Sequence, residues 1–124
     1  MTALRKLWRH SLLRLWLPLV GWMALIFLLS AQPDLPQPES GCLDLLISNG
    51  AHIFVFGVLA FLWARALGER PHGLLLAFAL SLVFALSDEF HQSFVPGRCA
   101  DPLDLVWDAL GAALALGFVA WRRR

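Results

Sequence analysis

Four long apolar segments occupy most of this 124-residue chain, and they constrain its fold more than any other feature. A helix that crosses a lipid bilayer needs roughly 20 consecutive, mostly apolar residues. Four segments meet this requirement with few charges inside them, at about 15–33, 46–65, 72–91 and 103–121. Short connections join them, and no internal repeat is visible. We therefore predict an all-α fold, a small four-helix transmembrane bundle in which residues 1–124 form one domain.

The composition supports a membrane protein and excludes several other classes. Hydrophobic residues make up 59% of the chain and charged residues 15%, against about 25% charged residues in ordinary soluble domains. A soluble domain of this size has too little interior to bury so much apolar surface. The lipid bilayer is therefore the expected partner. A disordered chain and a nucleic-acid-binding protein are not expected.

The distribution of basic residues predicts the orientation of the bundle. Arg98 is the one Lys or Arg residue that falls in the first or third connection. The others flank the opposite helix ends: Arg5, Lys6, Arg9, Arg14, Arg65, Arg70 and Arg122–Arg124. Because cytoplasmic loops carry an excess of Lys and Arg, we expect both termini in the cytoplasm and a multi-pass protein of the cytoplasmic (inner) membrane. The basic start also suits a signal peptide, but no good small-residue cleavage site follows, so we expect an uncleaved helix.

Polar side chains from all four predicted helices collect at the outward-facing end. Ionisable residues inside a span cost about 2.5–3.5 kcal/mol each and usually face a bundle interior or a water-filled cavity. Asp104, Asp108 and Gly111 share one helical face at i, i+4 and i+7, while Asp88 and Gln92 share a face of the third helix. We therefore predict a polar pocket between the second, third and fourth helices, open to the outside.

His52 and the acidic pair Asp88 and Glu89 are the candidate catalytic residues of this pocket. A histidine beside a carboxylate can exchange protons near neutral pH and act as a general acid or base. His52 has an alternative structural role, bonded to an acid of the third helix. Asp88 and Glu89 have one as well, because a solvated helix end also carries acids.

The remaining candidates are predicted to bind a ligand. They are Gln92, Arg98, Asp104 and Asp108. Arg98 either holds its loop by pairing with an acid or presents a fork to a phosphate or carboxylate of a lipid-linked ligand. Asp101 and Asp104 also fit the capped start of a helix with Pro102 at its first position. Asp104 therefore has both interpretations.

The spacing of His, Asp and Glu residues matches no known metal motif, so no metal and no cofactor are predicted. Cys42 and Cys99 both fall on the outward-facing side of the predicted topology. Two cysteines outside the cytoplasm can form a disulfide. They are either bonded or two unrelated thiols.

One motif spans the end of the third segment and the start of the fourth. Its residues are Asp88, Glu89, Gln92, Phe94, Pro96 and Arg98, followed by Asp104, Asp108 and Gly111. This spacing resembles the signature of VanZ-like membrane proteins, D-E-x-x-Q-x-F-x-P-x-R and then D-x-x-x-N-x-x-G. His52 and Phe56 resemble the family's upstream histidine and the aromatic residue four positions later. The chain departs from the pattern at Asn49, where the family often has Lys, and at Asp108.

The resemblance implies a protein of the cell envelope, because the family is named for resistance to the glycopeptide teicoplanin. It does not imply a reaction, so whether the chain is an enzyme stays open. We expect the outward-facing pocket to bind or act on a lipid-linked envelope precursor or a glycopeptide-type ligand. In the alternative, the chain is a non-catalytic membrane module whose polar cluster ties the helices together.

Overall fold

The fold is a bundle of four helices, seen here in a computed structural model that describes residues 2–32, 42–97 and 101–124. The helices are α1 (Thr2–Ser30), α2 (Cys42–Leu67), α3 (Gly73–Gln92) and α4 (Asp104–Arg122). All regular structure in the described residues is helical, and each helix is long and apolar enough to cross a membrane. The predicted fold class is therefore confirmed.

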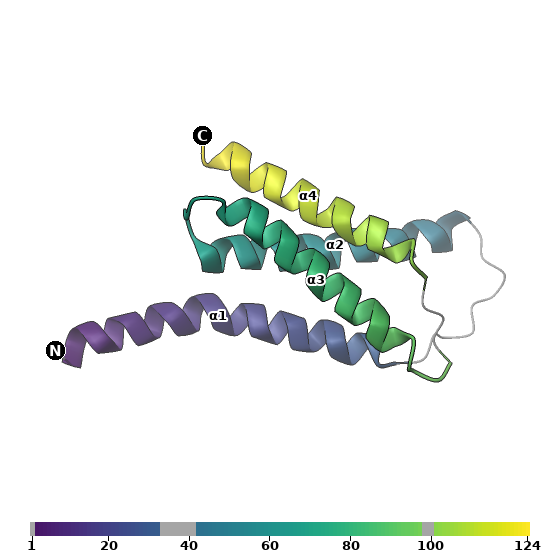
Figure 1. Cartoon of the computed structure of the whole chain (residues 1–124), viewed down its shortest axis with the longest axis horizontal. Coiled ribbons are helices and arrows are strands. Elements are labelled where there is room, and N and C mark those ends of the chain that lie inside the picture. Colours follow the sequence, from purple (N-terminus) through teal and green to yellow (C-terminus); the bar gives the residue numbers. More distant parts are fainter. Residues whose placement is uncertain (1, 33–41, 98–100) are drawn as a thin grey trace.

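Successive helices run in opposite directions, so both termini lie at the same end of the bundle (Figure 1). We call this end the basic end, because Arg65 of α2 and Arg122–Arg124 lie there. We call the other end the polar end, where Ser30 and Gln92 finish α1 and α3 and Asp104 begins α4. Orientation relative to the cytoplasm remains a prediction from the positions of the basic residues.

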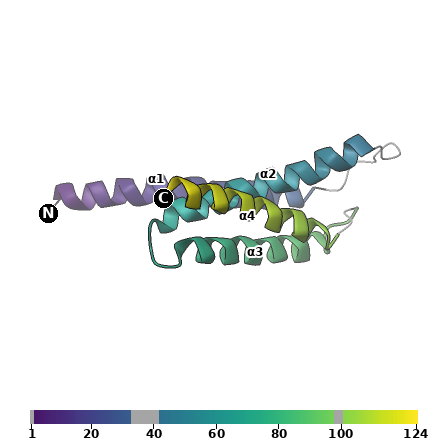
Figure 2. The same cartoon turned by 90° about the horizontal axis from the view of Figure 1, so that it is seen from above.

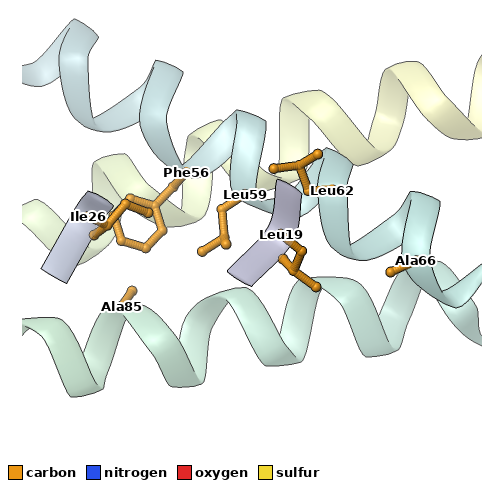
Figure 3. Packing of buried hydrophobic residues seen from close by; sticks show 7 residues of the cluster. All are labelled: Leu19, Ile26, Phe56, Leu59, Leu62, Ala66 and Ala85. Atoms are coloured by element: carbon orange, nitrogen blue, oxygen red, sulfur yellow. The ribbon is translucent and has the colours of Figure 1, made fainter. Parts of the chain in front are cut away.

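Helix α2 is the centre of the bundle, because α1, α3 and α4 all pack against it. Two clusters of buried apolar side chains fill the interior. The first joins α1, α2 and α3 (Figure 3) and consists of Leu19, Ile26, Phe56, Leu59, Leu62, Ala66 and Ala85. The second joins α2, α3 and α4 and consists of Ala60, Ala64, Leu67, Ala77, Ala112, Leu116 and Val119.

The outer surface of the bundle is also apolar. Large exposed hydrophobic side chains occur on every helix, among them Leu28, Phe54, Phe61, Leu75, Val83, Leu114 and Phe118. A soluble monomer rarely exposes contiguous apolar surface on this scale. Contact with lipid acyl chains accounts for it.

Helices α2 and α4 approach each other closely enough for their backbones to touch. A Cβ atom added to Gly111 would lie 2.8 Å from the Ile53 Cα atom, and one added to Gly57 would lie 3.3 Å from the Gly111 carbonyl oxygen. Small residues allow such contact between membrane helices. The small residues Gly111 and Ala112 of α4 are thus buried, and Gly111 packs against α2.

Helix α1 is longer than its predicted span and bends near its middle (Figure 1). It starts at Thr2, so its first turns extend past the other helices at the basic end (Figure 2). Pro18 lies inside it. A proline within a helix lacks the N–H that would bond to the carbonyl four residues earlier, and its ring bends the helix. The Pro18 ring accounts for the bend.

The carbonyl that Pro18 leaves without its usual donor belongs to Arg14, and Arg65 of α2 donates to it at 3.2 Å. A second bond from α1 to α2 joins the Trp22 indole Nε1 to the Val55 carbonyl oxygen at 3.0 Å. Both interhelical bonds end on main-chain oxygen atoms. They attach α1 to α2 at two heights in the bundle.

The turn from α2 to α3 ends α2 with Gly68 at φ 68°, a left-handed conformation that glycine adopts without strain. Arg123, just after α4, donates to the carbonyl oxygens of Ala64 and Gly68 at 3.4 Å each. A positive side chain at a helix C-terminus satisfies free carbonyls and opposes the negative end of the helix dipole. The end of α4 is thereby attached to the end of α2.

Candidate functional site

His52 lies between two acids of α4 at the polar end. Its Nδ1 atom is 2.8 Å from Asp108 Oδ1, and its Nε2 atom is 3.6 Å from Asp104 Oδ2. The Asp108 side chain is only 5% exposed, whereas His52 and Asp104 are each about one-fifth exposed. The two acids stand one helical turn apart, so a single imidazole reaches both.

The close packing of α4 on α2 explains this pairing. Gly111 and Asp108 lie three residues apart on the face of α4 that turns toward α2, and Ile53 of α2, against which Gly111 packs, adjoins His52. In its structural interpretation His52 was expected to bond to an acid of the third helix. The two carboxylates in contact with it here, Asp104 and Asp108, belong to the fourth helix.

A second polar group joins α3 to α1 at the same end. The Gln92 side-chain nitrogen donates to Ser30 Oγ and to Asp88 Oδ2, both at 3.4 Å. All three side chains are buried. Asp88 and Gln92 are one turn apart on α3, as the sequence predicts, and their shared face turns toward α1.

The two polar groups meet at a cavity of about 180 Å³ between α1, α2 and α3. We call it the polar-end cavity. Four polar residues line it, Ser30, His52, Asp88 and Gln92, together with the apolar residues Ile26, Leu29, Ala51, Val55 and Phe56. The cavity differs from the predicted pocket, which we expected between the second, third and fourth helices. Helices α2 and α4 are in backbone contact near this end, whereas α1 packs through side chains.

Glu89 and His91 lie apart from this wall. Glu89 is half-buried, and the negative charges of Asp104 and Asp108 repel its carboxylate. Its Oε1 atom has no hydrogen-bond partner within the described residues. The His91 ring stacks on Phe27 of α1, with ring centres 4.1 Å apart. Neither residue lines the cavity. Of the candidate catalytic residues, His52 and Asp88 line it together.

The start of α4 differs slightly from the predicted cap. The helix begins at Asp104 rather than Pro102, after a turn in which Asp101 Oδ1 accepts the Leu103 N–H at 3.0 Å. Asp101 therefore caps the turn before the helix. Asp104 makes its contact with His52 instead, which favours its interpretation as a pocket residue.

The predictions for Arg98 and for a disulfide between Cys42 and Cys99 lie outside the residues whose side chains are described. Within the described part of the chain, no group of three or more His, Cys, Asp or Glu side chains is placed to hold a metal ion. The described site is therefore one histidine, carboxylates and an amide. This set can form hydrogen bonds and transfer protons.

Sequence reasoning placed polar residues of the first helix at this end but missed that α1 lines the cavity. Ser30 was visible as a polar residue near the end of an apolar segment, but nothing in the spacing linked it to Gln92. Ile26 and Leu29 look like lipid-facing or core residues in the sequence. A helical pattern identifies which residues share a face, but it does not show which helix that face meets.

A bundle of four apolar helices with an acid–histidine cluster at one end defines a class, that of small multi-pass membrane proteins with a polar intramembrane site. The sequence model of the VanZ/LLP1 family matches residues 15–123, and the chain belongs to this family. The resemblance drawn from its motifs is thereby confirmed. No curated protein and no solved structure matches the chain.

Proposed function

We propose that this VanZ/LLP1 protein binds a lipid-linked ligand of the cell envelope in the polar-end cavity. The observation that carries the proposal is the composition of the cavity lining, which combines the polar residues Ser30, His52, Asp88 and Gln92 with apolar side chains of α1 and α2. Ligand sites are typically apolar clefts with a few convergent polar groups. A lipid also combines a polar part, its headgroup, with an apolar part, its acyl or polyprenyl chain.

The position of the cavity supports a ligand that arrives from within the bilayer. It lies between helices near one end of the bundle, where Ser30 and Gln92 close α1 and α3. A headgroup at the membrane surface occupies the same depth as such a helix end. The chain of the ligand would then follow the exposed apolar surface of the helices.

If the ligand is also turned over, His52 is the residue placed to move a proton. Asp108 holds the His52 ring through Nδ1 at 2.8 Å, as a buried carboxylate orients a catalytic imidazole. Asp88 faces the same cavity from α3. We therefore assign proton transfer to His52 with Asp108 as its positioning residue.

The proposal is tested by comparing envelope lipids and lipid-linked glycans in a deletion strain that carries the wild-type gene or a variant. We choose Asp88→Asn and His52→Phe, with Glu69→Gln as the matched control, because Glu69 is exposed and lies at the basic end. We expect a lipid species whose amount changes with wild-type protein and Glu69→Gln but not with the two cavity variants. Equal profiles for all four, at matched membrane levels, contradict turnover of an envelope lipid.

Teicoplanin susceptibility of the same strains tests the envelope phenotype that gives the family its name. We expect wild-type protein and Glu69→Gln to raise the inhibitory concentration and Asp88→Asn to leave it at the level of the deletion strain. An unchanged inhibitory concentration in all strains would mean that this chain does not confer glycopeptide resistance. That result would leave the proposed lipid site unaffected.

A non-catalytic module is the second candidate, and the bond between His52 and Asp108 favours it, because this bond ties α2 to α4. In the first candidate the polar residues bind a ligand, and in the second they stabilise the bundle. If Asp88→Asn and His52→Phe lower the stability of the purified bundle and change no lipid, the polar cluster is structural. If they change the lipid profile in a stable bundle, it is a ligand site.

A further inference from the structure

Gln92 has a fixed orientation in the polar-end cavity. Its side-chain nitrogen is 3.4 Å from Asp88 Oδ2 and 3.4 Å from Ser30 Oγ. A carboxylate accepts hydrogen bonds, so the nitrogen and not the oxygen of the amide must face Asp88. The Gln92 Oε1 atom is therefore turned the other way.

That oxygen is a buried acceptor without a donor. Gln92 is 2% exposed, and its Oε1 atom has no hydrogen-bond partner within the described part of the chain. Leaving a buried acceptor unsatisfied costs free energy, and native proteins usually pair such groups. Gln92 lines the cavity, so a molecule inside it that displaces the atoms covering Oε1 can supply the missing donor.

The negative charge around the cavity also favours a molecule that donates hydrogen bonds. Asp88 forms part of the wall, and Asp108 and Asp104 lie directly behind His52. A carboxylate accepts hydrogen bonds and attracts positive charge. A volume of about 180 Å³ corresponds to roughly six water molecules at about 30 Å³ each. It holds a headgroup fragment of several non-hydrogen atoms.

We propose that the polar-end cavity takes a headgroup rich in hydrogen-bond donors, a primary ammonium or a sugar hydroxyl, which bonds to Gln92 Oε1 and Asp88. This inference rests on the proposed function and specifies the ligand class. The apolar neighbours of the headgroup contact Ile26, Val55 and Phe56 of the same lining. Unlike the phosphate-binding fork that is one interpretation of Arg98, this contact selects the donor groups of the ligand and not its phosphate.

Native mass spectrometry of the full chain with matched pairs of lipids tests the inference. Phosphatidylethanolamine and phosphatidylcholine with the same acyl chains have the same charges, but only the first has N–H donors. Glucosyl diacylglycerol and diacylglycerol differ in the sugar hydroxyls. We expect the wild-type chain to retain the donor-bearing member of at least one pair about tenfold more, as one hydrogen bond involving a charged group allows. The pair that responds distinguishes ammonium from hydroxyl.

Three variants assign the preference to Gln92. Gln92→Met removes the acceptor and keeps the length of the side chain, and we expect it to abolish the preference. Gln92→Asn keeps an amide with both its donor and its acceptor and should retain part of the preference, which controls for damage to the fold. Ser87→Ala changes an exposed residue on the same helix and should behave as wild type.

The donor inference and the proposed function fail in different ways. Equal retention within both pairs, or a preference for phosphatidic acid over all four lipids, overturns the donor inference. A loss of this lipid binding in Ala51→Trp, which fills the cavity, would still support the proposed function. Failure of the wild-type chain to retain any lipid, or retention that Ala51→Trp leaves unchanged, overturns both.

Discussion

Helices α4 and α1 both pack against α2, but they do so in different ways. Helix α4 meets α2 backbone to backbone, because Gly111 presents no side chain to Ile53. Helix α1 is attached through long side chains, the Trp22 indole and the Arg65 guanidinium, whose hydrogen bonds end on main-chain carbonyls. The α2–α4 interface is therefore closed where Gly111 meets Ile53, and at the same end the α1 side has room for a cavity.

The difference shows how a chain this short can contain both a stable unit and a binding site. Small residues let α2 and α4 form a close pair that holds His52 against Asp108. Bulky residues keep α1 farther from α2, and the polar-end cavity opens on that side. The close α2–α4 contact thus positions His52, while the cavity on the α1 side is where the proposed ligand would bind.

The largest effect is expected from Gly111→Leu. A Cβ atom there would lie 2.8 Å from backbone atoms of Ile53, which cannot rotate away as a side chain can. Overpacking typically costs about 1–3 kcal/mol and occasionally more, and we expect about 3 kcal/mol or more. Unfolding of the purified bundle in mixed micelles of increasing SDS fraction measures this. Gly117→Leu is the control, since a Cβ there meets nothing within 4 Å. Equal losses in both variants contradict the close contact.

Asp108→Ala should have the next largest effect, because it leaves His52 without its 2.8 Å partner in a buried position. We expect a loss of about 1–3 kcal/mol in the same assay. Asp104→Ala removes a longer contact from a more exposed residue and should cost at most about 1 kcal/mol. Asp108→Asn keeps an acceptor for His52 and should restore most of the stability. The reverse order of Asp104 and Asp108 would contradict the geometry.

A double-mutant cycle tests the attachment of α1. Arg65→Met removes the donor to the Arg14 carbonyl, and we expect a cost of about 0.5–1.5 kcal/mol. In a Pro18→Ala background the restored N–H of residue 18 bonds to that carbonyl, so the same change should cost less. The coupling between the two changes is the measured quantity. Additive costs would mean that Arg65 does not replace the bond that Pro18 removes.

Trp22→Phe is expected to have the smallest effect. It removes one hydrogen bond to the Val55 carbonyl oxygen, and side-chain hydrogen bonds between membrane helices average about 0.6 kcal/mol. Trp121 is exposed, so Trp121→Phe serves as the reference for the change in ring size. A loss well above 2 kcal/mol for Trp22→Phe would show that the α1 interface is as tightly specified as the α2–α4 interface.

The sequence was sufficient to predict the four helices, the family and the inward face of α4. Helical periodicity put Asp104, Asp108 and Gly111 on one face, and the structure buries Asp108 and Gly111. The cost of a charge within an apolar segment also placed Asp88 correctly inside the bundle. These conclusions depend on residues within one helix.

Contacts between helices were harder to predict, because periodicity does not identify the neighbouring helix. The structural alternative for His52 was a bond to an acid of the third helix, whereas its 2.8 Å partner belongs to the fourth. The bonds of Arg65 and Trp22 end on backbone oxygen atoms, which every residue has and which therefore leave no trace in the sequence. A proline inside a helix implies that one carbonyl lacks its donor, but it does not identify the residue that supplies one.

The unequal lengths of the helices determine how the bundle can adapt to bilayers of different thickness. Helix α3 has 20 residues and α4 has 19, so at 1.5 Å per residue each spans about 30 Å, the thickness of the hydrocarbon core. Helix α1 has 29 residues and measures about 43 Å by the same rise. Its basic first turns can slide between headgroups and water, whereas α3 and α4 have no spare length. A thinner or thicker membrane would therefore strain the helices that carry Gln92 and Asp108 before it strains α1.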